Sequence, residues 1–234
     1  MKILEIQKRN FQLLSTVTNM KTPDDFKVNT VYSYDTPNDL KNYYNDWAHE
    51  YEDYTEQVNY ILPQKVVEIF CSYPLSSGST VLDIGCGTGL VGYFLGIIKQ
   101  DIWIEGTDIS SSMVQVAAKK TKPNFKPTYD WMIVQDFKKN KLLLEDHYDG
   151  IISAGTFTLG HLDCDDFINC IKYLKKNGLA VISIKEDHFI ENNFNEKISQ
   201  AKRNNLIKDV EYFKVNSYHS SFTAESIIVK FIKG

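Results

Sequence analysis

Three aspartates and a short run of glycines are the residues of this 234-residue chain whose types and spacing could do chemistry. Asp83, Asp108 and Asp136 each stand at or just beyond the end of a short apolar segment that is typical of a buried strand. Parallel strands end at one edge of a sheet, so the three carboxylates are expected to line one cleft. Carboxylates there favour a ligand that carries hydroxyl groups or positive charge.

The turn Gly85-Cys86-Gly87-Thr88-Gly89 separates the first of these strands from a helix. Glycine lets the backbone turn sharply and approach a ligand closely, so this turn predicts a nucleotide site. Gly87, Gly89 and Gly92 also have the spacing of a dinucleotide fingerprint, which keeps an NAD(P)-dependent oxidoreductase open as an alternative. Two observations oppose it. Asp83 would repel a pyrophosphate but suits an amino group and a sulfonium, and no tyrosine has a lysine four residues later, as short-chain dehydrogenases require.

Strands and helices alternate along the chain, which predicts a parallel sheet with helices on both faces. The last two strands have no helix between them and predict an antiparallel hairpin at one edge. The expected fold class is therefore α/β: a doubly wound, seven-stranded, mostly parallel sheet with an antiparallel C-terminal hairpin and the glycine turn near its middle. The strands are expected at residues 80–84, 102–107, 131–134, 148–153, 179–184, 210–215 and 227–232.

Helices before and between these strands are expected at residues 59–73, 90–99, 110–120, 165–175 and 193–204. Before them, residues 1–36 are interpreted as an N-terminal extension and residues 37–234 as the domain itself. The domain would open with a helix through Tyr43, Trp47 and Tyr51, whose four-residue steps place the rings on one face. These rings could cover a ligand, attracting a cation by roughly 0.5–2 kcal/mol, or simply pack on the edge of the sheet.

The composition excludes several classes of protein. Lys and Arg number 26 against 30 Asp and Glu, a net charge of −4, so no basic excess exists to bind nucleic acid. No segment is apolar enough for a membrane helix. The four cysteines form no CxxC pair, so the sequence contains neither a zinc motif nor a redox motif of that kind. Free thiols in a chain without an apparent leader are expected in the cytoplasm. We expect no nucleic acid, membrane or metal partner, and the oligomeric state stays open.

Residues 81–89, with the sequence VLDIGCGTG, resemble the first motif of the class I S-adenosylmethionine-dependent methyltransferases, and residues 106–110, GTDIS, resemble the second. The resemblance spans residues 60–234. It implies the Rossmann-like fold of that superfamily, with S-adenosylmethionine as cofactor and S-adenosylhomocysteine as product. It places Asp83, Gly85, Gly87 and Gly89 at the methionine part, Asp108 at the ribose, and Ile109, Met113, Asp136 and Phe137 at the adenine. The expected cofactor site also includes Tyr43, Trp47, Tyr51, Cys86, Gln135, Ala154 and Gly155.

Three further segments are similar to the Williams–Beuren syndrome region methyltransferase-like family. They are residues 44–52, 148–161 and 184–187. The substrate of that family does not carry over to this chain, and residues 1–36 lie outside the resemblance.

Methyl transfer is an in-line displacement in which the protein mainly aligns the nucleophile and excludes water. The segment at residues 153–157, Ser-Ala-Gly-Thr-Phe, lacks the Pro-Pro-Tyr motifs that superfamily members use on amide or nucleobase nitrogens, so a small-molecule acceptor is expected. His161, on the loop after the fourth strand, is the candidate base because imidazole titrates near neutral pH. Catalysis by proximity alone, and a cofactor-binding partner protein without activity, stay open as alternatives.

Overall fold

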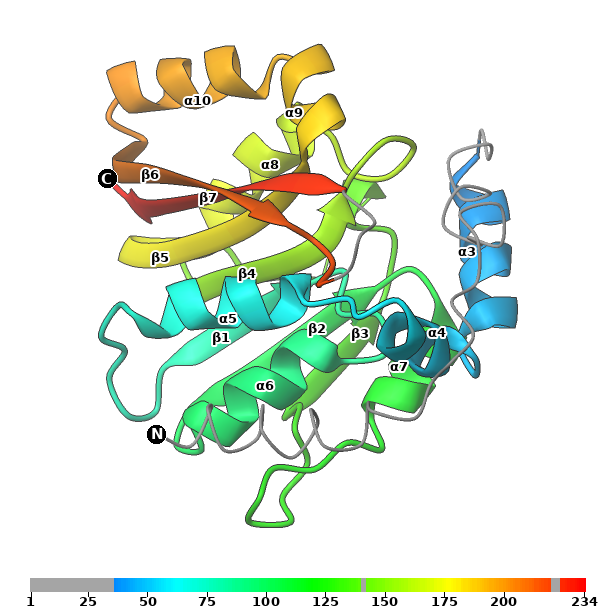
Figure 1. Ribbon diagram of the computed structural model, residues 1–234. Helices are drawn as coiled ribbons and strands as arrows, with labels where there is room; N and C mark the ends of the chain where they lie inside the picture. Colours follow the sequence, from blue (N-terminus) through cyan, green and yellow to red (C-terminus); the bar gives the residue numbers. More distant parts are fainter. Residues whose placement is uncertain (1–35, 140–141, 220–223) are drawn as a thin grey trace.

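The computed structural model describes residues 36–139, 142–219 and 224–234, and its centre is a seven-stranded sheet in the order β3-β2-β1-β4-β5-β7-β6 (Figure 1). The strands are β1 (Thr80–Ile84), β2 (Trp103–Asp108), β3 (Trp131–Val134), β4 (Tyr148–Phe157), β5 (Leu174–Lys185), β6 (Ile207–Asn216) and β7 (Glu225–Lys233). β7 is antiparallel to both of its neighbours, β5 and β6. The expected fold class, strand number and C-terminal hairpin are confirmed.

Helices cover both faces of the sheet and the edge at which its parallel strands end (Figure 1). α5 (Leu62–Cys71) and α6 (Leu90–Ile98) lie on one face, and α8 (Cys164–Cys170) and α10 (Phe194–Arg203) lie on the other. α9 (Glu186–Glu191) follows β5 directly. Beyond the carboxyl ends of the strands lie α3 (Pro37–Trp47), α4 (Tyr51–Gln57) and α7 (Ser111–Ala117).

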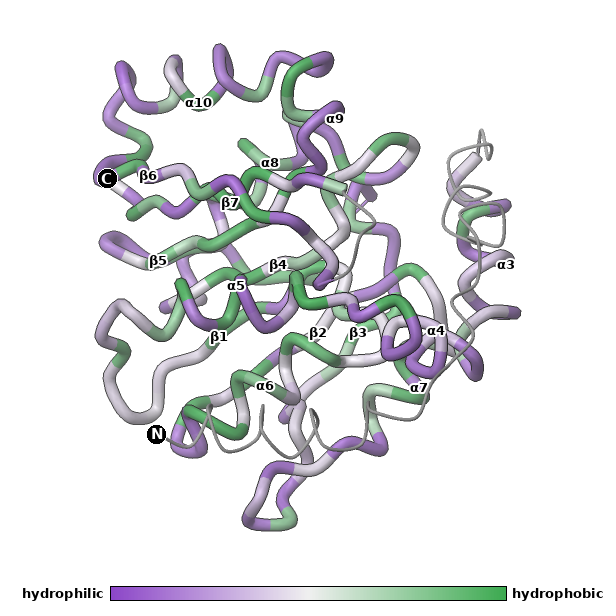
Figure 2. Tube along the Cα trace, viewed as in Figure 1, coloured by the Kyte–Doolittle hydropathy of each residue, from purple (hydrophilic) through white to green (hydrophobic). Residues whose placement is uncertain are grey.

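Two apolar layers sandwich the sheet, because successive strand residues point to opposite faces. Val81 of β1 packs with Val66 and Phe70 of α5, whereas its neighbour Leu82 packs with Phe167 of α8 on the other face. Figure 2 shows hydrophobic residues along the inner strands and hydrophilic ones on the outer turns of α10. The inner strands are thus rigid supports for the residues at their carboxyl ends.

Several predicted elements have other bounds in the structure: β4 ends at Phe157 and not at residue 153, β6 begins at Ile207 and not at residue 210, and α9 was not predicted. The helix predicted at 59–73 begins at Leu62, and the one predicted at 110–120 ends at Ala117.

Two further differences concern whole segments. The expected helix through Tyr51 ends at Trp47, and α4 begins at Tyr51 after a short turn. No glycine or proline marks this break, so the sequence pattern carries no signal for it. The expected helix 165–175 ends at Cys170, and β5 begins at Leu174, where a register shift against β4 accommodates Asn177 at a φ of 63°.

The predicted extension, residues 1–36, lies outside the described residues except for Thr36, whose hydroxyl caps α3 by accepting a hydrogen bond from the Asp39 amide. Within the described ranges, no helix is both long and apolar enough to cross a bilayer.

Candidate functional site

The glycine turn is held against β2 by its own backbone. The amides of Gly85 and Cys86 both donate to the Thr107 carbonyl, at 2.8 and 3.0 Å. Gly87 follows with a φ of +53°, a conformation that favours glycine, and nothing lies within 4 Å of where a Cβ would stand. A side chain on Gly85 would collide with Thr156. Gly87 is therefore the glycine of this turn that faces open space.

Asp108, at the end of β2, reaches the same turn. One carboxylate oxygen accepts the Gly87 amide at 2.9 Å, and the other accepts the Ser110 amide at 2.9 Å. Burial raises the pKa of this carboxyl, and the backbone amides act in the opposite direction. The half-buried carboxylate thus links the glycine turn to the start of α7, at the position where the sequence predicted an acceptor for ribose hydroxyls.

Asp83 lies beneath the turn and is fully buried. Its Oδ2 accepts a hydrogen bond of 2.6 Å from the Tyr129 hydroxyl, and its Oδ1 has no hydrogen-bond partner among the described residues. Burial raises the pKa of the Asp83 carboxyl to about 7, Tyr129 lowers it, and the charge of Asp108 raises it further. In this conformation Asp83 supports the turn from below and does not line the cleft.

Cys86, inside the turn, is a buried packing residue. Its sulfur lies against Gly106 of β2, and burial raises the pKa of the thiol well above its ordinary value. The thiol therefore stays protonated, which suits packing and not nucleophilic chemistry.

The residues expected at the adenine fall into two groups. Met113 is buried in α7, and its amide donates to the Ser110 side chain that caps this helix, while Ile109 is half-buried just before it. Asp136 accepts the Lys138 amide at 3.0 Å, and Phe137 packs edge-on against Tyr173 in the core. Phe137 is thus held by the protein interior.

Gln135 and the end of β4 complete the predicted cofactor residues. The Gln135 amide side chain donates to the Thr107 hydroxyl at 3.1 Å, which ties β3 to β2. Ala154 packs on the α5 side of the sheet, and the Gly155 amide donates to the Ser183 hydroxyl at 2.9 Å. A Cβ at Gly155 would lie 2.6 Å from the Tyr60 hydroxyl, so only glycine lets Tyr60 approach β4.

An aromatic cluster of α3 and α4 stands over this edge of the sheet. Trp47 is its centre, with the rings of Tyr43, Tyr51 and Tyr54 at 5.5, 4.9 and 5.1 Å. The cluster is separate from both sheet cores. The predicted rings therefore do gather on one face, although two helices supply them.

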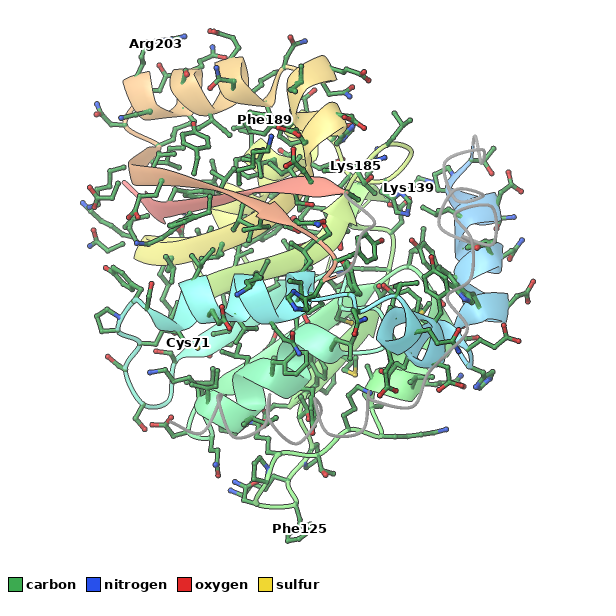
Figure 3. The ribbon with its side chains drawn as sticks, viewed as in Figure 1. Cys71, Phe125, Lys139, Lys185, Phe189 and Arg203 are labelled. Atoms are coloured by element: carbon green, nitrogen blue, oxygen red, sulfur yellow. The ribbon has the colours of Figure 1, made fainter. Side chains whose placement is uncertain are left out.

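A pocket that is partly open to solvent lies between this cluster, the ends of β4 and β5, and the start of β7. Its aromatic walls are Tyr44, Trp47, Tyr51, Tyr54, Tyr60, Phe157 and Tyr218. Its hydroxyl groups come from Thr55, Thr158, Ser183, Ser217 and Ser226, and its ionisable groups are His161, Lys185 and Glu225. Figure 3 shows Lys185 at the end of β5. Two buried polar atoms of this wall, Trp47 Nε1 and Thr158 Oγ1, have no hydrogen-bond partner among the described residues.

His161 lies in this pocket with a defined geometry. Its Nδ1 is 3.0 Å from the Leu159 carbonyl, which can only accept, so Nδ1 carries the proton. Its Nε2 therefore accepts, and the Tyr44 hydroxyl lies 3.0 Å away. Burial lowers the pKa of His161 to about 4, so the imidazole is neutral at pH 7.

Of the predicted site residues, the structure brings Trp47, Tyr51, Gly155 and His161 to the pocket. Tyr43 packs on Tyr44 and Trp47 and does not line it. Four tyrosines near the site were not predicted from the sequence: Tyr44, Tyr60, Tyr129 and Tyr218. Only Tyr44 carried a signal, because it is adjacent to the predicted stripe; the other three depend on contacts between distant segments.

Comparison with known proteins gives the class of this fold and site. The family described as a methyltransferase domain matches residues 75–224, and the chain belongs to this family. It is similar to an uncharacterized methyltransferase, YdaC, of Bacillus subtilis, at 23% identity over 111 residues, which are 47% of this chain and 59% of that protein. The chain thus covers less than two thirds of this relative's length.

Two solved structures share the fold. A TehB-like SAM-dependent methyltransferase of Corynebacterium glutamicum has a TM-score of 0.56 at 23% identity, covering 82% of this chain and 99% of that one. Magnesium protoporphyrin IX methyltransferase of Synechocystis, with bound SAH, has a TM-score of 0.59 at 16% identity, covering 84% and 99%. Among the described residues, no group of histidines, cysteines or acids could hold a metal ion.

Proposed function

We propose that the protein is an S-adenosylmethionine-dependent methyltransferase that acts on a small-molecule acceptor by in-line displacement. The observation that carries the proposal is the open space over Gly87, at the carboxyl ends of the strands and beside the Asp108 carboxylate. Ligands of doubly wound sheets bind at this edge. Membership of the methyltransferase-domain family supports the reaction class.

The residues present fit this cofactor. Gly87 leaves room for a ligand against the backbone, Asp108 offers oxygens to hydroxyl groups, and Asp83 supplies buried negative charge beneath a cation. When bound, S-adenosylmethionine supplies a methyl group on a sulfonium whose sulfur keeps the bonding electrons as the methyl leaves. The protein aligns the acceptor and excludes water. Trp47 and the tyrosines around it would cover the site.

A small molecule suits the aromatic pocket, because its walls combine aromatic rings with a few hydroxyl and ionisable groups. Trp47 Nε1 and Thr158 Oγ1 would give such an acceptor two buried hydrogen-bonding groups. Where the acceptor atom is protonated, we propose His161 as the base. The acceptor's proton passes to the Tyr44 oxygen while the Tyr44 proton passes to His161 Nε2, and the freed electron pair attacks the methyl group.

We also propose that the chain belongs to the finer Williams–Beuren syndrome region methyltransferase-like family. In support, residues 44–52 supply Tyr44, Trp47 and Tyr51 to the pocket, and residues 148–161 supply His161. A cytoplasmic location is proposed on the four free cysteines.

Thermal shift and calorimetry with S-adenosylmethionine, S-adenosylhomocysteine, NAD and NADP test the cofactor. S-adenosylhomocysteine should raise the melting temperature, since a ligand at 100 times its Kd stabilises the native state by about 2.7 kcal/mol. NAD should not. Asp108→Ala should weaken S-adenosylhomocysteine binding about tenfold to a hundredfold, because a hydrogen bond to a charged group contributes roughly 1.5–3 kcal/mol. Tight NAD binding without S-adenosylhomocysteine binding would overturn the proposal.

A further inference from the structure

Tyr129 lies between α7 and β3, outside every motif of the sequence, and its ring is buried beneath the glycine turn. A Cβ at Gly89 or Gly106 would come to 2.9 Å from this ring, and one at Gly92 would come closer still. Glycine at these three positions therefore forms a slot that the ring fills. The third glycine of the dinucleotide-like spacing, Gly92, is explained by this packing without any ligand.

The hydroxyl of Tyr129 ties together the two elements that flank the turn. It donates to Asp83 Oδ2 of β1 at 2.6 Å and accepts the Gly92 amide of α6 at 3.1 Å. A hydrogen bond donated to a carboxylate stabilises its charged form. The slot fixes the ring, and the ring fixes the hydroxyl, so the position of the Asp83 carboxylate depends on Tyr129.

The ionisable groups that face Asp83 are Tyr129, Cys86 and Asp108. Burial raises the pKa of both Tyr129 and Cys86 well above their ordinary values, so they stay protonated at neutral pH. Among the described residues that face Asp83, only Asp108 adds its negative charge to that of Asp83 itself. Asp108 accepts two backbone amides, whereas Asp83 accepts the Tyr129 hydroxyl, and the Gly92 amide lowers the pKa of Asp83 by a smaller amount.

We infer that Tyr129 is a positioning residue of the cofactor site: its hydroxyl holds the Asp83 carboxylate ionised beneath the glycine turn, where that charge attracts a cationic ligand over Gly87. The inference rests on the proposed function, because it needs a ligand with an ammonium or a sulfonium in the cleft. Tyr129 acts only through Asp83 and the turn. Its loss should change ligand affinity through the charge state of a buried carboxyl.

Tyr129→Phe removes the hydroxyl and keeps the ring in its slot. We would titrate the wild type and this variant with S-adenosylhomocysteine by calorimetry, from about pH 6 to about pH 9, a range that spans the pKa of Asp83 near 7. At pH 7 the variant should bind about tenfold more weakly or worse, the loss of one hydrogen bond to a charged group. Its affinity should rise with pH at a higher midpoint than in the wild type, and the two curves should converge at high pH.

Tyr148→Phe is the matched control. Tyr148 is also buried, and its hydroxyl donates to a carboxylate, Glu105 Oε2 at 2.7 Å, away from the turn. Its loss should lower the melting temperature without moving the affinity or its midpoint. In an Asp83→Asn background, Tyr129→Phe should no longer shift the pH profile of affinity. If Tyr129→Phe alone does not fold, Asp83→Asn serves as the test, because it should flatten the pH profile seen in the wild type.

The failures are distinguishable. If the wild type does not bind S-adenosylhomocysteine, the proposed function fails. If the wild type binds it and Tyr129→Phe binds with equal affinity and the same midpoint, the role of Tyr129 is refuted while the cofactor stands. A weaker Tyr129→Phe with an unmoved midpoint also refutes it, because that result describes general damage to the turn.

Discussion

The imidazole of His161 has a single available lone pair, on Nε2, and the Tyr44 hydroxyl occupies it. A buried imidazole with its pKa lowered to about 4 is neutral at pH 7, the form that accepts a proton. The same shift weakens it as a base, so proton transfer is expected to accompany methyl transfer and not to precede it. Tyr44 is then the group that an acceptor would meet first.

His161→Ala should lower turnover about a hundredfold to ten-thousandfold and leave S-adenosylhomocysteine affinity unchanged, the size of a general-base contribution. Tyr44→Phe should lose a comparable factor if the proton passes through its hydroxyl. The rate of methyl transfer to an acceptor found by screening measures both, and the acidic limb of the wild-type profile near pH 4 should vanish in His161→Ala. His147→Ala, before β4, is the control. Normal turnover in His161→Ala would mean that proximity alone carries the reaction.

Site residues could be predicted where a local sequence motif identifies them. They could not be predicted where a contact between distant segments gives them their role. The sequence predicted Asp83, Asp108 and Gly87 because strand ends and glycine spacing are local. It could not predict Tyr129, which reaches Asp83 across 46 positions. Asp83 supports the turn from below and does not line the cleft. This role also could not be predicted, because it depends on the burial of Asp83, which residue spacing does not show.

The cover formed by α3 and α4 is attached at two sides of the site. On the α7 side, the Ser110 hydroxyl and the Ser112 amide both donate to Asn45 Oδ1, at 2.7 and 3.2 Å. On the pocket side, Tyr44 bonds to His161. An ion pair between Lys120 and Glu52 of α4 adds to the α7 side. All these attachments are side-chain contacts outside the sheet cores, so opening the cover costs less than separating elements packed in those cores.

Amide hydrogen exchange across α3 and α4 should slow when S-adenosylhomocysteine binds, because a ligand beneath the cover favours its closed state. Asn45→Ala should raise the exchange rate of α3 and α4 in the free protein. At saturating ligand the exchange of the variant should match that of the bound wild type. At subsaturating ligand the ligand should slow exchange less in the variant than in the wild type. Asn38→Ala, an exposed residue in the first turn of α3, is a control that keeps the Asn45 bonds. Equal protection with and without ligand would make α3 a fixed part of the shell.

The order of strands and helices could be predicted from the alternation of strand and helix patterns along the chain. The residues at which several of these elements begin or end could not. The strand pattern predicted seven strands and the closing hairpin, since buried strands read as short apolar runs. The split between α3 and α4 was missed because four-residue spacing is compatible with one helix or two. The predicted start of β5 came too late because Lys175, Lys176 and Asn177, which follow Leu174, are polar and pair irregularly with β4.

For the whole molecule, Asp83 makes the free energy of unfolding depend on pH. In the unfolded chain its carboxyl ionises near pH 4, whereas in the folded chain its pKa is raised to about 7. The folded state therefore holds an extra proton between these values, and stability falls as pH rises through that window. The raised pKa of Asp108 acts with the same sign.

Asp83→Asn should accordingly be more stable than the wild type above pH 7 and lose this advantage towards pH 4. The full difference is on the order of 4 kcal/mol, from about 1.36 kcal/mol per pH unit over roughly three units. Urea unfolding at several pH values without ligand measures it, with the exposed Asp101→Asn as control. The same variant should bind S-adenosylhomocysteine more weakly. The Asp83 carboxyl of the wild type thus lowers stability and raises ligand affinity. Parallel curves for the wild type and Asp83→Asn would contradict the raised pKa.

The three tryptophans of the chain differ strongly in solvent exposure, because one of them lies inside the aromatic cover. Trp47 is 4% exposed at the centre of the cluster, while Trp103 and Trp131, at the starts of β2 and β3, are 58% and 64% exposed. A water-borne quencher would therefore extinguish the emission of the two edge indoles and spare the third. What remains is a fluorescence signal from inside the cover, so that its opening can be watched in unlabelled protein.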